Sequence, residues 1–106
     1  MKKIHEFEIV RKNIDGKAGS VDVYDIIDEN IQAGVRIVKS NSDVPKRTHK
    51  HPERQLLYVI EGTAKITNEK ETFSLKPGDF VLLESNEEHY VTTGDTEAKL
   101  FEIKYP

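Results

Sequence analysis

Residues 49–62 read HKHPERQLLYVIEG and contain two of the four histidines of the chain. His49 and His51 lie two positions apart, so on a strand their imidazoles point to the same face. The apolar run at residues 56–60 is typical of a strand that is covered on both faces, and Gly62 ends it. Imidazole is the commonest metal ligand in proteins. His49 and His51 are therefore candidate metal ligands.

Outward from this stretch, the chain consists of short strand patterns separated by turn residues. Asn68-Glu69-Lys70 lies between two alternating segments, as a hairpin turn does. Lys76-Pro77-Gly78-Asp79 has proline and glycine at the positions of a type II turn. The predicted strands cover residues 21–26, 35–38, 56–60, 64–67, 71–75, 80–83, 89–93 and 99–103. Without sustained helical periodicity, this pattern predicts an all-β sandwich or barrel.

Composition limits the classes of protein that fit. The chain has 106 residues, no cysteine and a formal net charge of −3, and 33% of its residues are charged. This length predicts one domain over residues 1–106. The lack of cysteine excludes disulfides, thiolate metal sites and cysteine nucleophiles. The nearly balanced charge gives no case for nucleic acid or membrane surfaces as partners.

Two further expectations concern location and assembly. The 106 residues contain no apolar run long enough for a signal peptide or a membrane span, which predicts a cytoplasmic protein. A small chain with so much charge buries only a modest core, and pairing with a second copy would stabilise it. We therefore expect a homodimer.

The two histidine segments resemble the two sequence motifs of the cupin superfamily. The first motif covers about residues 43–62, with His-x-His followed by Gln55, and with Gly62 seven positions after Gln55. The second covers about residues 78–93, where Gly78 and His89 keep the family spacing. The chain departs from the family pattern at five positions: Asp43 for Gly, Gln55 for the more common Glu, Glu84 for Pro, Asn86 for Gly and Thr93 for Asn.

This resemblance implies a double-stranded β-helix, the jelly-roll barrel of cupins, with a metal held by His49, His51, Gln55 and His89. Three imidazoles and an oxygen suit one divalent transition metal, which could be Fe, Mn, Co, Ni, Cu or Zn. Water or substrate would fill the open positions. A neutral ligand set leaves the full charge of the dication in place, which favours a small anionic ligand. The amide of Gln55 is also a poorer donor than a carboxylate, which should weaken metal binding.

Other side chains near the motifs are candidates for binding a substrate or for lining its pocket. Arg54 could clamp an anionic substrate. Tyr58 could donate a proton from the rim, although a strand tyrosine more often packs against its neighbours. Phe101 and Ile103 are predicted to face the core or the pocket. No residue has an assignable role as a general base.

The resemblance predicts a small metal-dependent enzyme in which the metal acts as a Lewis acid or activates O2. Dioxygenase, lyase, isomerase and decarboxylase chemistries all occur in similar cupins, and the fold does not choose among them. The alternative is a non-catalytic module that binds or senses a sugar or carboxylate on the same barrel. The lack of an acid or base residue favours this alternative, whereas the lack of a segment that could read DNA favours the enzyme. A barrel with an empty site is a third reading, which the presence of all three histidines disfavours.

Overall fold

The computed structural model describes residues 1–47 and 51–106, and its folded part is built almost entirely of strands. One short 3-10 helix, η1 (Glu6–Glu8), precedes them. The strands are β1 (Lys12–Asp15), β2 (Ser20–Asp28), β3 (Gln32–Val38), β4 (Asp43–Val44), β5 (Arg54–Glu61), β6 (Ala64–Thr67), β7 (Thr72–Leu75), β8 (Phe80–Leu83), β9 (Tyr90–Thr92) and β10 (Ala98–Tyr105). The predicted all-β fold is confirmed.

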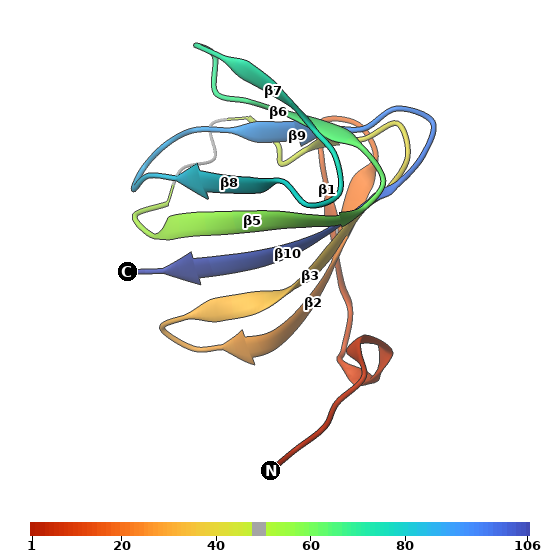
Figure 1. Ribbon diagram of the computed structural model, residues 1–106, viewed down its shortest axis with the longest axis vertical. Coiled ribbons are helices and arrows are strands. Elements are labelled where there is room, and N and C mark those ends of the chain that lie inside the picture. Colours follow the sequence, from red (N-terminus) through yellow and green to blue (C-terminus); the bar gives the residue numbers. More distant parts are fainter. Residues whose placement is uncertain (48–50) are drawn as a thin grey trace.

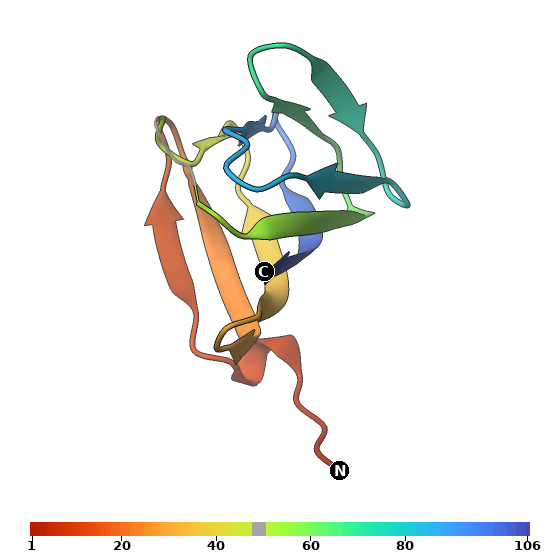
Figure 2. The ribbon, with the colours of Figure 1, turned by 90° about the vertical axis from the view of Figure 1, so that its left-hand side faces the viewer.

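The strands form two antiparallel sheets, one large and one small (Figures 1 and 2). The six-stranded sheet has the order β1-β2-β3-β10-β5-β8, and the four-stranded sheet has the order β4-β9-β6-β7. Strand β10, the last in the chain, lies between β3 and β5 and pairs with both. The C-terminal strand thus joins the first half of the chain to the strand that follows the His-x-His segment.

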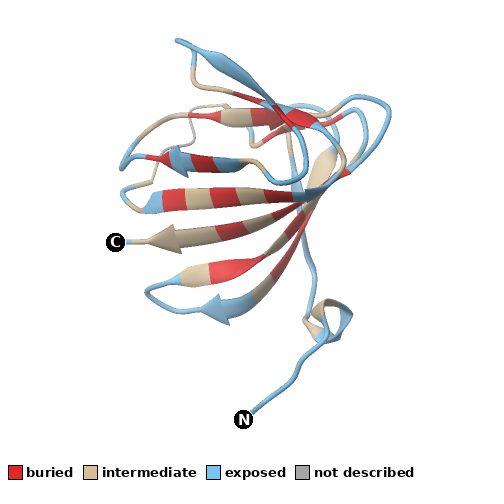
Figure 3. Ribbon diagram, in the orientation of Figure 1, coloured by how far each residue is buried: buried red, intermediate tan, exposed pale blue. Residues whose placement is uncertain are grey.

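The core lies between the two sheets, and strand alternation selects its members. On β5, Gln55, Leu57 and Val59 are buried while the residues between them are more exposed, a banding that is visible in Figure 3. Valine, leucine, isoleucine and alanine from both sheets complete the cluster: Val38, Val44, Leu57, Val59, Ala64, Ile66, Leu75, Val81, Leu83, Val91, Ala98 and Leu100. Burial of these side chains, at about 25 cal/mol per Å² of apolar surface, is the main force that holds the sheets together.

The turns follow the chemistry of their residues. Gly78 has a φ of 96°, and the Asp79 amide donates to the Lys76 carbonyl at 3.1 Å, which confirms the type II turn. The Asn68 side-chain oxygen accepts from the backbone amides of Lys70 and Glu71 at 3.0 and 2.9 Å, so the β6–β7 hairpin is also confirmed.

Two short strands were not predicted. β1 is exposed along its whole length, and β4 has only two residues, so neither has a hydrophobic alternation to reveal it. Both are held by pairing with strands that are distant in sequence or better buried, namely β2 and β9. No helix in the described part of the chain is long and apolar enough to cross a membrane.

Candidate functional site

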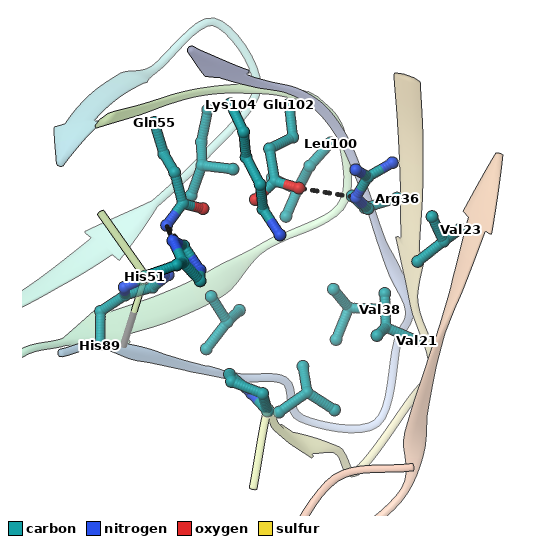
Figure 4. Close-up of a pocket in the computed structure, with 14 residues that line it drawn as sticks. Val21, Val23, Arg36, Val38, His51, Gln55, His89, Leu100, Glu102 and Lys104 are labelled. Carbon is teal, nitrogen blue, oxygen red and sulfur yellow. Dashed lines mark hydrogen bonds and ion pairs between the residues drawn. The ribbon is translucent and has the colours of Figure 1, made fainter. Parts of the chain in front are cut away.

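A cavity of about 110 Å³ opens between the two sheets (Figure 4). Its walls are largely apolar, and its polar groups come from the His51–Gln55 segment, from His89 and from strands β3 and β10. The lining consists of Val21, Val23, Arg36, Val38, Val44, Pro45, His51, Gln55, Leu57, His89, Val91, Leu100, Glu102 and Lys104. An apolar pocket with a few convergent polar groups is the usual form of a small-molecule site.

Gln55 and His51 are in contact at one end of this cavity. Gln55 is the second residue of β5 and is 2% exposed. Its side-chain nitrogen lies 3.4 Å from Nδ1 and 3.3 Å from Nε2 of His51. Figure 4 shows the amide oxygen pointing away from the His51 ring. An amide binds a metal through its oxygen, so this side chain would have to turn about its last torsion to act as a ligand.

His89 is held in one tautomer by the backbone. It precedes β9 by one residue, is buried, and its Nδ1 lies 3.0 Å from the carbonyl oxygen of Glu87. Because a carbonyl only accepts hydrogen bonds, Nδ1 carries a proton, and in the neutral ring this leaves the lone pair on Nε2. Metal-binding histidines are typically fixed through the second ring nitrogen in this way. The rings of His51 and His89 lie edge to face, with centroids 6.2 Å apart.

Two hydrogen bonds bring together the segments that carry these histidines. The Asn86 backbone amide donates to the His51 carbonyl at 2.9 Å, and the Ser85 hydroxyl donates to the Pro52 carbonyl at 2.6 Å. Asn86 has a φ of 59°, a left-handed conformation that asparagine tolerates, so its replacement of the family's glycine preserves the turn. The turn before His89 is thereby joined to the residues that follow the His-x-His pair.

Glu87 anchors the same turn through its side chain. The Asn68 side-chain amide donates to the Glu87 carboxylate at 2.9 Å, and the Glu84 backbone amide donates to it at 3.0 Å. These hydrogen bonds, that of Asn68 first, lower the pKa of the Glu87 carboxyl below its ordinary value. The ionised Glu87 therefore fixes the carbonyl group that orients His89.

The predicted metal ligands are only partly described. His51, Gln55 and His89 meet at the cavity, while His49 lies outside the described residues. Within residues 1–47 and 51–106, no group of three or more His, Cys, Asp or Glu side chains could hold a metal ion. The two imidazoles and the amide fit the donor chemistry of a transition metal. The four-residue ligand set remains a prediction.

Arg54 and Tyr58 do not line the cavity in the described structure. Arg54 is exposed, and its Nε donates to the Pro106 backbone oxygen at 3.2 Å, while its guanidinium lies 4.6 Å from the centre of the Tyr105 ring. The Tyr58 ring packs on Phe80, with centroids 4.5 Å apart. Strand alternation explains this placement, because Gln55 and Leu57 take the inward positions of β5.

Three charged residues that line the cavity were missed by the sequence reasoning. Arg36 on β3 is buried, and its Nε donates to Glu102 Oε2 on β10 at 2.7 Å. Its Nη1 lies 2.6 Å from Asp25 Oδ1 on β2. Lys104, two positions after Glu102, also lines the cavity. The sequence signal that could have found Glu102 and Lys104 is the alternation of residues 98–104. On a strand, this alternation places either the even-numbered or the odd-numbered residues inward.

That alternation was assigned to the wrong face. Phe101 and Ile103 were predicted to face the core or pocket, but Leu100, Glu102 and Lys104 line the cavity instead. Phe101 and Ile103 are half-buried on the opposite face of β10. The hydrophobic character of Phe101 and Ile103 favoured an inward position for them. Glu102 can be buried instead because its carboxylate pairs with the buried Arg36.

Comparison with known proteins agrees with this architecture. A sequence model of the cupin domain family matches residues 35–104. A polyketide cyclase, RemF from Streptomyces resistomycificus, superposes with a TM-score of 0.80 at 20% identity, over 98% of this chain and 78% of that one. A protein described as a predicted oxalate decarboxylase from Thermotoga maritima superposes with a TM-score of 0.85 at 18% identity, over 98% of both chains. These likenesses concern the fold.

A relative at the sequence level is a regulator. The uncharacterized HTH-type transcriptional regulator YisR of Bacillus subtilis (strain 168) is 35% identical over 66 residues, which are 58% of this chain and 23% of that protein. The chain thus aligns with about a quarter of the length of this relative. The family match covers most of the chain, including both histidine segments and all of the residues that line the cavity except Val21 and Val23. By its sequence and its two-sheet barrel, the chain belongs to the cupin domain family.

Proposed function

We propose that this protein is a small metal-dependent cupin enzyme that acts on a small, oxygenated, anionic substrate in the cavity between its sheets. The observation that carries the proposal is the orientation of His89. Its Nδ1 donates to the Glu87 carbonyl, which leaves Nε2 available as a ligand in a cavity that His51 and Gln55 also line. His49, His51, Gln55 and His89 would hold one divalent transition metal.

A bound dication would supply Lewis-acid chemistry or O2 activation. The protein contributes a buried amide and two imidazoles that carry no charge when neutral, so the cavity favours an anion once the metal is present. The apolar walls, Val38, Leu57, Val91 and Leu100 among them, limit water around the substrate and strengthen these electrostatic interactions.

The first test is the metal content of protein purified without added metal. We expect about one equivalent of a transition metal in the wild-type protein, because three histidines form a single site with room for one ion. His51→Ala and His89→Ala should lose this metal. The matched control is His5→Ala, because His5 is exposed and caps the N-terminal 3-10 helix away from the cavity. Elemental analysis by mass spectrometry gives the stoichiometry.

If the wild-type protein holds no metal even after incubation with Fe²⁺, Mn²⁺, Co²⁺, Ni²⁺, Cu²⁺ and Zn²⁺, the proposal is wrong. Where metal is bound, oxygen uptake and product formation across a panel of small carboxylic acids separate an enzyme from a binder. Turnover that disappears in both histidine variants and persists in His5→Ala supports the enzyme.

A second candidate function is a ligand-sensing module. Its support is the similarity to part of YisR, together with a likeness in fold, at 14% identity, to the cupin domain of a regulator from Enterobacter cloacae. Under this hypothesis the same cavity binds a sugar or carboxylate without turnover. Binding of a panel member that leaves it chemically unchanged over many hours, with metal present, favours the sensor over the enzyme.

A further inference from the structure

Strand β10 carries two charged side chains on the face that lines the cavity. Glu102 and Lys104 are two residues apart, so they project to the same side of the sheet, and both line the cavity. Figure 4 shows the Lys104 amine directed into the open space beside Glu102 and across from Gln55 and His51. These two side chains lie outside the predicted metal-ligand set.

The two carboxylate oxygens of Glu102 differ in their hydrogen bonding. Oε2 accepts from Arg36 Nε at 2.7 Å. Within the described residues, no donor reaches Oε1, and this atom is not fully buried. Glu102 as a whole is 8% exposed. A carboxylate oxygen in such a place accepts a hydrogen bond from whatever ligand enters, and it gains more from doing so than it would in water.

Lys104 carries a positive charge into the cavity. Among the described residues, no carboxylate lies within 4.0 Å of its amine and no hydrogen-bond acceptor is in reach. Arg36, which also lines the cavity, is already paired with Glu102 and Asp25. An anionic group that enters the cavity would therefore find its partner in Lys104 rather than in Arg36.

We propose that the cavity binds a small hydroxycarboxylate, with its carboxylate on Lys104 and its hydroxyl donating to Glu102 Oε1. The inference rests on the proposed function in that it names the ligand class of the same cavity. The volume of about 110 Å³ sets the size, because drug-sized ligands occupy about 300–1,000 Å³. A ligand of a few carbon atoms fits.

The test uses three probes that differ by one group each, titrated into metal-free protein and followed by amide chemical shifts. Glycolate carries both recognition groups, acetate lacks the hydroxyl, and methyl glycolate lacks the negative charge. We expect glycolate to bind about tenfold or more tightly than either of the others, since each lost contact is a charge-assisted hydrogen bond. The shifts should map to β10 and the cavity walls.

Two variants assign the contacts. Lys104→Met should bind glycolate no better than methyl glycolate, and Glu102→Gln should lose the preference for glycolate over acetate. Lys99→Met is the matched control, because Lys99 lies on the opposite face of β10, where its amine pairs with Glu6 at 2.6 Å. It should bind glycolate as the wild-type protein does.

The proposal is overturned if wild-type protein binds the three probes equally or not at all, or if Lys104→Met retains wild-type affinity for glycolate. The comparison of the three probes on wild-type protein holds even where a variant fails to fold. Because these titrations contain no metal, their failure is separate from a failure of the metal analysis. Metal without glycolate selectivity keeps the proposed function, and selectivity without metal keeps only the binding site.

Discussion

Arg36 shows at the residue scale how a charged side chain can belong inside a small barrel. Its guanidinium is fixed by Glu102 on one neighbouring strand and by Asp25 on the other. All three residues are largely buried, and both carboxylates pair with the Arg36 guanidinium, which compensates their charge. The cluster links β2, β3 and β10 across the middle of the large sheet.

Replacing Arg36 by methionine should destabilise the protein by about 3–5 kcal/mol, because two buried carboxylates lose their counterion. Urea unfolding followed by circular dichroism measures this loss. The matched control is Arg54→Met, whose guanidinium is exposed and bonds to the chain terminus, and which should change the free energy of unfolding by no more than about 0.5 kcal/mol. Equal costs for the two variants would contradict the assigned role of the cluster.

At the scale of elements, the turns were predictable and some strands were not. The type II turn at residues 76–79 and the hairpin at residues 68–70 depend on a few side chains whose local chemistry is the same in any protein. The strand β4 and the inward face of β10 depend instead on partners far away in sequence, namely β9 for the first and β3 for the second.

Gly62, Gly78 and Gly94 differ in backbone conformation and in the space around them, and both properties affect the cost of adding a side chain. Gly62 has a φ of 76°, and a Cβ placed there would lie 2.3 Å from the Glu97 carbonyl oxygen. Gly78 has a φ of 96° but open space around it, and Gly94 has open space without a positive φ. We expect Gly94→Ala to be close to neutral, Gly78→Ala to cost about 1–2 kcal/mol, and Gly62→Ala to cost more than Gly78→Ala.

Thermal unfolding of the three variants checks this order. The clash at Gly62 is with backbone, which cannot move aside as a flexible side chain would, so its variant should have the lowest melting temperature. A Gly62→Ala protein as stable as Gly78→Ala would show that the contact with Glu97 is relieved by a small backbone shift.

At the scale of the whole molecule, the outer face of the large sheet carries exposed apolar residues at its β8 edge. Phe80 and Leu82 are 66% and 67% exposed, and Phe80 stacks on Tyr58 of the neighbouring β5. Large apolar side chains at a sheet edge favour association with another chain. We propose that a second copy of the chain covers this face, as the homodimer expected from the size and charge of the chain would require.

Sedimentation equilibrium should then give twice the chain mass of 12.1 kDa, and Leu82→Lys should shift the protein towards the monomer. Ile14→Lys is the control, because Ile14 is also an exposed aliphatic residue but lies on β1, at the opposite edge of the large sheet. A wild-type protein that stays monomeric at millimolar concentration would rule out this dimer.

The all-β class, the turns and the family could be predicted from the sequence, because these depend on local periodicity, on a few glycine, proline and asparagine positions, and on histidine spacing. The sequence also identified His51, Gln55 and His89 as residues that meet at one cavity. The folded structure was needed to show that Arg36, Glu102 and Lys104 line that cavity and that Arg54 and Tyr58 do not. The physical reason is that alternation leaves two faces for each strand, and only pairing with distant strands decides whether a buried charge finds its partner.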